Sequence, residues 1–495
     1  MIEFIAHNLA PIMFLSLIGF LLIGYPVAFS LAANGLLFFV IAVELSPYSN
    51  EISLAWPLLQ TLPGRVLDVM RNDTLLAIPF FTFMGIILEK SGMAEDLLDT
   101  IGQLFGPIRG GLAYAVIIVG ALLAATTGVV AASVIAMGLI SLPIMLRYGY
   151  DKRLATGVIA ASGTLAQIIP PSLVLIIMAD QLGRSVGDMY EGAIIPGLIL
   201  TSLYVGYVAI LSIIKPSSCP ALPADARTLH GFKLLLRVLT ALVPPLLLIF
   251  LVLGTIFLGI ATPTEGGAMG ATGALILALG RKRLSWKLLK QAMETTGKLS
   301  SFVVFILVGS TVFGLIFRGV NGDLWVEHLL LGLPGGQAGF LIVVNLLVFV
   351  LAFFLDFFEL SFIIVPLLAP VADKLGIDLV WFGILLAVNM QTSFMHPPFG
   401  FALFYLRSVA PASVKTTDIY WGAIPFVCIQ IIMVTLIIVF PNIVSYGDPE
   451  HRTTTEQGDG SDLGALMQQG GMSGDSADQK DPAADLLKNL QQNEK

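Results

Sequence analysis

The sequence predicts an all-α polytopic membrane protein built from two inverted repeats, and three observations predict it. The 495-residue chain is 56% hydrophobic and 12% charged, with a mean hydropathy of +0.90, whereas a soluble domain is about a quarter charged. Apolar segments long enough to cross a bilayer recur along the chain. Two longer apolar stretches, each interrupted by polar residues, occur in both halves in the same order. These features exclude a soluble enzyme, a disordered protein and a fibre.

Ordinary spans account for most of the apolar sequence. A membrane-crossing helix needs about 17–25 residues. Segments of suitable length and composition are expected at 7–23, 27–45, 74–90, 150–180, 189–214, 233–258, 263–280, 297–318, 378–406 and 418–446.

Two further segments, 111–146 and 337–372, are nearly uncharged but too long for one straight span. The first is interrupted by Thr126-Thr127-Gly128, and the second between Asp356 and Glu359. Two half-depth helices that meet at a polar tip, forming a re-entrant hairpin, explain both the length and the interruption. One long tilted helix is the alternative.

Each predicted hairpin is followed by a span with a break. The first break lies at 161–171 and the second at 389–398, and both end in a Pro-Pro pair. The shared order of span, hairpin and broken span indicates a repeat, with chance similarity among apolar helices as the alternative. If each hairpin returns to its own side, an odd number of spans separates the repeats, so the repeats are inverted.

Charge sets the expected orientation. Most lysines and arginines between the spans fall on one side, which should be cytoplasmic, so both chain ends should be periplasmic. Residues 447–495 carry most of the net charge of −7 and are rich in Gly, Ser, Gln and Asp, which predicts a disordered acidic tail. Cys219 and Cys428 fit no metal or disulfide framework, and no basic stripe supports nucleic-acid binding.

The two breaks carry groups that bind ions. Proline has no backbone N–H, so each Pro-Pro pair frees carbonyl oxygens in the preceding turn, and helix N-termini attract anions. Hydroxyls at the breaks and the first hairpin tip would add hard oxygen ligands, although each hydroxyl could instead bond to its own helix. They belong to Thr126, Thr127, Ser162, Thr164, Thr392 and Ser393.

Four ionisable residues can be interpreted either as functional or as structural. Asp356 and Glu359 lie inside the second hairpin, where a carboxylate could coordinate a cation or carry a proton, or could cap a buried helix. Glu265 follows Pro263 at a helix start, where capping is favoured. His396 precedes Pro397 and could carry a proton, contact a carboxylate substrate, or pack through a hydrogen bond.

These features favour a secondary transporter. No lysine or arginine lies in the middle of a span, so an anionic substrate would be balanced by bound cations, which favours Na⁺ coupling. A stand-alone cation-coupled exchanger or channel with the same repeats is the alternative. No nucleotide-binding loop and no nucleophile–base pair is present, so the chain is not expected to be an enzyme.

The sequence resembles the large membrane subunit of tripartite ATP-independent periplasmic (TRAP) transporters over residues 24–444. The resemblance rests on 146–151 leading to 168–172, on 259–265, and on 389–400 with its Pro397-Pro398-Phe399-Gly400 ending. It implies an elevator mechanism like that of the ion transporter superfamily, driven by two or more Na⁺ ions. It also implies a bacterial inner-membrane location, a small four-helix membrane subunit, and a periplasmic binding protein that delivers a small organic acid.

The resemblance places two cation sites and a substrate site. The first cation site would comprise Thr126, Thr127, Gly128, Ser162, Gly163, Thr164 and Pro170. The second would comprise Asp356, Asn389, Thr392, Ser393 and Pro397. Substrate contacts would come from Thr127, Ser162, Asp356, Glu359 and His396. Two positions depart from the family pattern: Val129 and Val130 follow a tip that is often serine-rich, and His396 replaces a threonine.

The expected domains follow the repeats. Residues 1–110 would form scaffold and arm helices, and 111–188 the first hairpin and broken helix of a transport domain. Residues 189–336 would be scaffold and arm helices again, and 337–406 the second hairpin and broken helix. A last scaffold span at 407–446 would precede the tail at 447–495.

Overall fold

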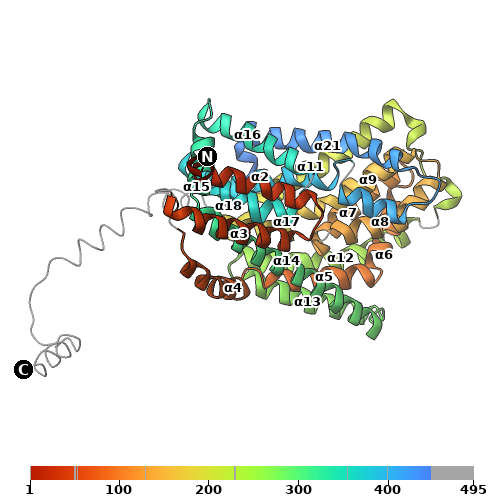
Figure 1. The fold of residues 1–495 in the computed structure, drawn as a ribbon. Helices are drawn as coiled ribbons and strands as arrows, with labels where there is room; N and C mark the ends of the chain where they lie inside the picture. Colours follow the sequence, from red (N-terminus) through yellow and green to blue (C-terminus); the bar gives the residue numbers. More distant parts are fainter. Residues whose placement is uncertain are drawn as a thin grey trace, which may run out of the picture. The chain divides into compact units, whose positions relative to one another are not determined.

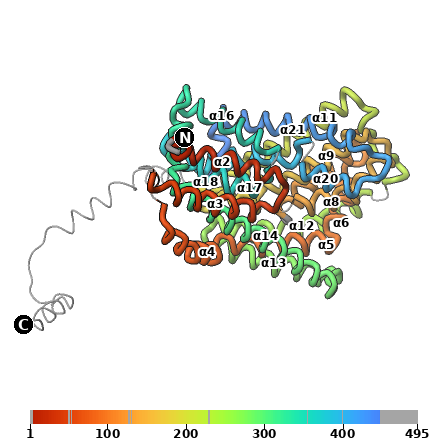
Figure 2. The backbone as a smooth tube through the Cα atoms, viewed as in Figure 1, coloured from red at the N-terminus to blue at the C-terminus, as the bar shows by residue number. Residues whose placement is uncertain are grey.

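The fold is helical throughout the described part of the chain. The computed structural model describes residues 2–48, 52, 54–128, 130–227, 230–353, 355–397 and 400–446, and in these residues the backbone forms helices and no strand. The described helices belong to one unit, Met1–Tyr446 (Figures 1 and 2). The predicted acidic tail, 447–495, lies outside the described residues.

Membrane-crossing helices dominate this unit, as the composition predicts. Two helix pairs bend sharply: α5 (Ala77–Lys90) with α6 (Met93–Phe105) at 58°, and α15 (Gly322–Leu331) with α16 (Gly336–Leu351) at 118°. Six single helices of the described residues are long and apolar enough to span a bilayer: α3 (Val27–Leu45) with its extension η1 (Ser46–Tyr48), α8 (Val130–Arg147), α11 (Val186–Ile214), α12 (Gly231–Phe257), α14 (Trp286–Gly319) and α21 (Thr416–Val439).

The N-terminal helices pack onto the middle of the chain. α1 (Ile2–His7) and α2 (Leu9–Leu22) precede α3, and η2 (Trp56–Thr61) with α4 (Leu62–Met70) follows it. A Cβ on Gly309 of α14 would overlap the backbone of Ala28 in α3. The two helices therefore approach at backbone distance, as small residues allow in membranes.

The first predicted hairpin corresponds to α7 (Gly111–Thr127) and α8, which pack against each other. The chain breaks at Gly128, whose φ of +58° lies in the left-handed region that favours glycine. The interruption is therefore where the sequence predicts it. α8 has 18 residues, so this arm is longer than the half-depth helix expected.

The first broken helix comprises α9 (Lys152–Thr164), η3 (Leu165–Gln167) and α10 (Leu173–Leu182). Asp151 caps α9 by accepting a 2.8 Å hydrogen bond from the backbone N–H of Arg153. α9 is buried from Leu154 onward and packs closely on α21. A Cβ on Gly157 would overlap the carbonyl oxygen of Gly422 in α21, so these helices also meet at backbone distance.

The middle of the chain connects the repeats through α11, η4 (Pro216–Ser218), η5 (Ala224–Ala226), α12, α13 (Pro263–Gly280), α14 and α15. α13 begins with a capping box. The backbone N–H of Thr262 donates to Glu265 Oε2 at 2.8 Å, and the backbone N–H of Glu265 donates to Thr262 Oγ1 at 3.3 Å. The capping role expected for Glu265 is confirmed.

The second half repeats the order of the first. α16 is followed by α17 (Phe357–Glu359), a π-helical turn η6 (Leu360–Ile364) and α18 (Val365–Lys374). The second broken helix then comprises α19 (Leu379–Met390), η7 (Gln391–Phe394) and α20 (Phe401–Val409), before α21 and η8 (Pro441–Ile443). Each repeat thus contains an interrupted hairpin and a helix broken by a 3-10 turn.

Candidate functional site

The first break exposes backbone carbonyls inside the protein. Pro170 and Pro171, joined by a cis peptide bond, cannot donate to the carbonyls of Ala166 and Gln167. The Gln167 carbonyl instead accepts a 2.6 Å hydrogen bond from Ser172 Oγ. The Ser172 hydroxyl also caps α10 by accepting from the Val174 N–H at 3.2 Å. Neither of these Ser172 bonds reaches the Ala166 carbonyl, which lost its helical donor at Pro170.

The predicted hydroxyl ligands of the first break bond to their own helix. Ser162 Oγ donates to the Val158 carbonyl at 2.6 Å, and Thr164 Oγ1 donates to the Ala161 carbonyl at 2.8 Å. Both side chains are fully buried. Each hydroxyl proton is thus used locally, and a hydroxyl oxygen has two lone pairs with which it can accept a hydrogen bond or coordinate a cation.

The tip of the first hairpin lies against this break. A Cβ on Gly128 would come within 3.4 Å of the Leu173 side chain and 3.6 Å of the Pro171 carbonyl oxygen. Further along the hairpin, Gly120 lies against Ser162 and Val134 lies against Gly163. The structure therefore places different parts of the first hairpin against Ser162, against Gly163 and against Pro171. The side chains of Thr126 and Thr127 lie outside the described residues.

The second break is organised around Asn389. Its Nδ2 donates to the carbonyl and Oδ1 of Asn345 in α16, at 2.8 and 2.9 Å, and its own carbonyl accepts from Thr392 Oγ1 at 2.6 Å. The Ser393 hydroxyl is buried and has no hydrogen-bond partner among the described residues. Pro397 cannot donate to the Ser393 carbonyl, so this carbonyl lacks its ordinary helical donor.

The two breaks meet through a direct hydrogen bond. Gln391 Nε2 donates to Thr164 Oγ1 at 3.1 Å, and the Met395 sulfur lies 3.8 Å from the same hydroxyl. Gln430 of α21 donates from Nε2 to the Tyr204 hydroxyl of α11 at 3.0 Å and lies 3.6 Å from the Met395 sulfur. The sequence interpretation did not assign Asn345, Tyr204 or Gln430; the signal for two of them is an amide inside an apolar span.

About half of the buried polar side-chain atoms without a partner among the described residues lie near these breaks, and the others are spread along the rest of the chain. In a folded protein such groups are rare and cost free energy, so each one needs an explanation. Among the described residues, atoms of this kind near the breaks belong to Gln167 (both amide atoms), Gln391 (Oε1), Ser393 (Oγ), His396 (both ring nitrogens) and Gln430 (Oε1).

Asp356 and Glu359 form a reciprocal capping box at the second hairpin. The Glu359 N–H donates to Asp356 Oδ1 at 2.9 Å, and the Asp356 N–H donates to Glu359 Oε2 at 3.0 Å. The structural interpretation of both carboxylates is therefore realised. Tyr405 of α20 lies within electrostatic reach of Asp356, which places this carboxylate near the second broken helix. None of the hydrogen bonds among the described residues joins it to Asn389, Thr392 or Ser393.

His396 lies in an aromatic pocket beside the second break. Its ring stacks on Phe353 at a centroid distance of 4.2 Å and meets Phe349 edge-on at 4.5 Å. The side chain is 1% exposed, and the backbone carbonyl of Ala352 faces the ring without hydrogen-bonding geometry. The histidine thus packs through its faces, and neither ring nitrogen meets the geometric criteria of a hydrogen bond with the described residues.

The second hairpin also contacts α14 and both broken helices. Ser310 of α14 donates from Oγ to the Phe362 carbonyl of η6 at 2.6 Å. Ser361 lies 3.6 Å from the Met178 sulfur of α10 and 3.8 Å from the Met390 sulfur of α19. η6 therefore connects both broken helices with α14. Among the described residues no group of His, Cys, Asp and Glu has the arrangement of a transition-metal site.

Comparison with known proteins covers nearly the whole described unit. Residues 14–443 match the family model described as tripartite ATP-independent periplasmic transporter, DctM component. The chain is 30% identical over 451 residues to the C4-dicarboxylate TRAP transporter large permease protein DctM of Vibrio cholerae, covering 87% of this chain and 95% of that protein.

Two further relatives have other names. The isethionate TRAP transporter permease protein DctMQ of Oleidesulfovibrio alaskensis is 28% identical, over 82% of this chain and 61% of that protein. The sialic acid TRAP transporter permease protein SiaT of Haemophilus influenzae is 26% identical, over 86% of this chain and 66% of that protein.

A solved structure has a similar fold. The crystal structure of the Alcanivorax borkumensis YdaH transporter, described as having an unusual topology, aligns with a TM-score of 0.55 at 14% identity. The alignment covers 84% of this chain and all of that one. At this identity the similarity concerns the arrangement of helices alone.

Proposed function

The chain belongs to the tripartite ATP-independent periplasmic transporter family as its DctM component, the large membrane subunit, and from this we propose that it imports a small organic carboxylate together with Na⁺. At the level of the family, it is a multi-pass inner-membrane transporter subunit that takes up a solute with a binding protein, and it is not an enzyme. Substrate and coupling ion are the proposed part.

One observation carries the proposal: the unpaired polar groups around the two meeting breaks. Burying such groups without a partner destabilises a fold, so their presence supports a site completed by a ligand. Among the described residues the buried polar side chains include no lysine or arginine. A carboxylate there would need another source of positive charge, and bound Na⁺ with helix N-termini would supply it.

We assign the ions to the two breaks. The first Na⁺ would be held by oxygens from Thr126, Thr127, Gly128, Ser162, Gly163, Thr164 and the segment before Pro170. The second would be held by Asp356, Asn389, Thr392, Ser393 and the segment before Pro397. The substrate carboxylate would lie between them and meet Thr127, Ser162, Asp356, Glu359 and His396.

The names of the relatives support an organic anion as cargo, because they specify C4-dicarboxylate, isethionate and sialic acid. We propose that a periplasmic binding protein delivers the solute and that a small four-helix membrane subunit completes the complex. The hairpins and broken helices would then slide as a body against the remaining helices in an elevator movement, with both termini in the periplasm.

Reconstitution tests the proposal. The complete three-part system in proteoliposomes, supplied with a panel of organic acids, should accumulate one of them only under an inward Na⁺ gradient. Accumulation driven equally well by K⁺ would reject Na⁺ coupling. Uptake by this chain alone, without a binding protein, would favour the stand-alone exchanger or channel.

A further inference from the structure

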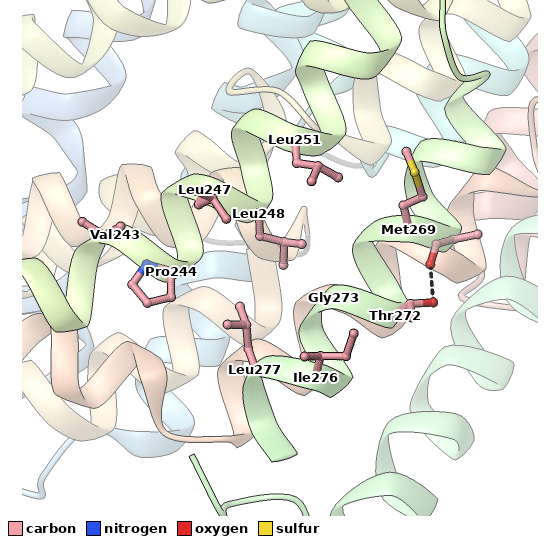
Figure 3. A pocket seen from close by; sticks show the side chains of 11 residues that line it. Val243, Pro244, Leu247, Leu248, Leu251, Met269, Thr272, Gly273, Ile276 and Leu277 are labelled. Carbon is pink, nitrogen blue, oxygen red and sulfur yellow. Dashed lines mark hydrogen bonds between the residues drawn. The ribbon is translucent and has the colours of Figure 1, made fainter. Parts of the chain in front are cut away.

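An apolar groove runs between α12 and α13, away from the two breaks. Its volume is about 730 Å³ (Figure 3). The lining contains a single side-chain polar atom, Thr272 Oγ1, which donates to the Ala268 carbonyl at 2.9 Å. The groove therefore offers hydrocarbon and sulfur surface only. Its lining residues are Val243, Pro244, Leu247, Leu248, Leu251, Ala268, Met269, Thr272, Gly273, Ile276 and Leu277.

The groove opens to the outside of the described unit. Leu247 on one wall and Ile276 on the other are each 63% exposed. In a membrane-spanning chain, side chains exposed at this depth face lipid tails or another hydrophobic molecule. Figure 3 shows both residues on the facing walls of the groove.

One end of the groove is cationic. α12 and α13 run in opposite directions, so the start of α12 lies beside the end of α13. Arg281 Nη2 confirms this by donating to the Thr240 carbonyl at 3.0 Å, an acceptor that Pro244 leaves free in the helix. The basic residues around this end are Lys233, Arg237, Arg281, Lys282 and Arg283.

The neighbouring carboxylates offset only part of this charge. Asp96 of α6 pairs with Arg281 at 3.4 Å and with Arg283 at 3.3 Å, and Glu95 and Asp99 of α6 lie near Arg237 and Arg283. No ion pair forms at Lys233 or Lys282 among the described residues, and both side chains are exposed. Lys233 lies 14 residues before Leu247 and 18 residues before Leu251, each close to a whole number of helical turns. Lys233 is therefore on the groove face of α12.

Aromatic side chains mark the same end. Phe232, at the start of α12, is 76% exposed, and Trp286, at the start of α14, is 80% exposed. Tryptophan at the end of a membrane helix is typical of the boundary between lipid tails and headgroups. The cationic end therefore lies at headgroup level, on the side that the charge distribution predicts to be cytoplasmic.

The length of the groove fits within one lipid leaflet. From Val243 to Leu251, the ends of the groove lining on α12, the helix rises about 12 Å at 1.5 Å per residue, which lies within the about 15 Å of half a hydrocarbon core. A partner's transmembrane helix would run for about 20 residues, or about 30 Å, and so would extend well past the groove. An acyl chain fits the groove better than a helix does.

We infer that the groove between α12 and α13 binds an anionic phospholipid. One acyl chain lies along Leu247, Leu251 and Ile276, and the phosphate meets Lys233, Arg281 and Lys282. Basic pockets between membrane helices on the cytoplasmic side recognise lipid headgroups in this way. The inference concerns a site remote from the breaks and does not depend on the proposed substrate or coupling ion.

Native mass spectrometry of the purified full chain, loaded with equal dioleoylphosphatidylglycerol and dioleoylphosphatidylcholine, tests the site. Wild-type protein should retain phosphatidylglycerol preferentially. Each basic residue beside an anionic headgroup favours binding by about fivefold, so Lys233→Gln with Lys282→Gln should reduce the preference by about 25-fold. Lys215→Gln with Lys298→Gln, a matched pair of exposed lysines elsewhere, should leave it unchanged.

A second pair of variants tests the acyl part. Ile276→Trp fills the groove and should abolish retention of both lipids, with the milder Thr272→Leu as a check if the tryptophan variant misfolds. Phe250→Trp, on the exposed surface of α12 outside the groove lining, should behave as wild type.

Two results would overturn the inference. The first is a lack of headgroup selectivity at the proposed phosphate site. It would appear as equal retention of the two lipids by the wild-type chain, or as a preference for phosphatidylglycerol that persists in the Lys233→Gln, Lys282→Gln variant. The other is efficient cross-linking of a cysteine at Leu247 to the small membrane subunit in the assembled complex, which would make the groove a protein interface.

Discussion

Asp356 and Glu359 combine a structural role with a proposed ionic one. Each side chain accepts a hydrogen bond from the other residue's backbone N–H, and this bond needs an acceptor oxygen but no charge. Asparagine caps a helix about as well as aspartate, and glutamine serves at the third helical position. The cap and the charge can therefore be separated by amide substitutions.

Asp356→Asn should abolish Na⁺-driven uptake while the unfolding temperature of the assembled complex stays close to that of wild type. Asp356→Ala removes the cap as well and should cost about 0.5–2 kcal/mol of stability. Uptake assays and thermal unfolding of both variants, with Glu359→Gln alongside, check this. Wild-type uptake with an unchanged Na⁺ titration in Asp356→Asn would remove Asp356 from the cation site.

Ser393 differs from these carboxylates because its buried hydroxyl makes no hydrogen bond to the described residues. Ser393→Ala should raise the Na⁺ concentration for half-maximal uptake several-fold without lowering thermal stability, because removing an unpaired buried hydroxyl costs little or is favourable. Ser141→Ala is the matched control, since its hydroxyl is also buried and unpaired but lies well along α8 from the hairpin tip. Equal Na⁺ titrations for all three proteins would contradict the assignment.

Individual contacts at the site could be predicted from the sequence only in part. The sequence predicts the two Pro-Pro breaks and the hydroxyls beside them, because a proline interrupts the helix in which it lies. The partners of those groups come from distant parts of the chain: Asn345 bonds to Asn389, and Gln391 bonds to Thr164. No local pattern encodes such pairs. The aromatic neighbours of His396, Phe349 and Phe353, likewise lie more than 40 residues away in the chain.

At the scale of elements, the hydropathy pattern predicts where helices are interrupted. It does not predict where two consecutive helices bend against each other. The breaks at Gly128 and around Gln391 fall where polar residues enter apolar runs. The bends between α5 and α6 and between α15 and α16 were not predicted. Gly92 and Gly335, with φ of +74° and +94°, lie at these bends, but a glycine alone does not distinguish a bend from a straight, closely packed helix.

The contact between α14 and the second hairpin gives a test at this scale. Under the proposed elevator movement, the 2.6 Å bond from Ser310 to the Phe362 carbonyl joins a stationary helix to a moving one. In a chain with Cys219 and Cys428 replaced by alanine, a cysteine pair at 310 and 362 bridged by a short reducible thiol cross-linker should therefore stop uptake, and reduction should restore it.

A pair within the hairpin serves as the control for that cross-link. Gln337 Nε2 donates to the Leu375 carbonyl at 2.6 Å, so cysteines at 337 and 375 join two parts expected to move together and should leave uptake intact. Undiminished uptake with a quantitatively cross-linked 310–362 pair would argue against relative movement at this contact.

At the scale of the whole molecule, the distribution of positive charge sets the expected orientation. Arg147, Lys152, Lys215, Arg281 and Lys282 lie at helix ends on the same predicted side, which the positive-inside rule assigns to the cytoplasm. The chain ends then belong to the periplasm, where a binding protein would dock.

Protease added to intact spheroplasts should accordingly remove residues 447–495. A cleavage site inserted between Arg283 and Trp286 should be cut only after lysis, because that loop is expected in the cytoplasm. Immunoblots for tags at the two positions give the readout. The opposite pattern of protection would invert the topology, and with it the leaflet assigned to the lipid groove.

The contact between Gly157 and Gly422 has a consequence for how this sequence can change. A Cβ on Gly157 would overlap the Gly422 carbonyl, and one on Gly422 would overlap the Arg153 carbonyl, so even alanine separates α9 from α21. In a saturation library selected for growth on the transported solute, both positions should reject every other amino acid, whatever its polarity. The neighbouring exposed Trp421 should accept most apolar residues. Shrinking a neighbouring side chain cannot compensate for either substitution, because the overlapped atoms are backbone carbonyl oxygens of Gly422 and Arg153, which no substitution removes. An evolving chain would therefore have to rebuild this helix pair as a unit.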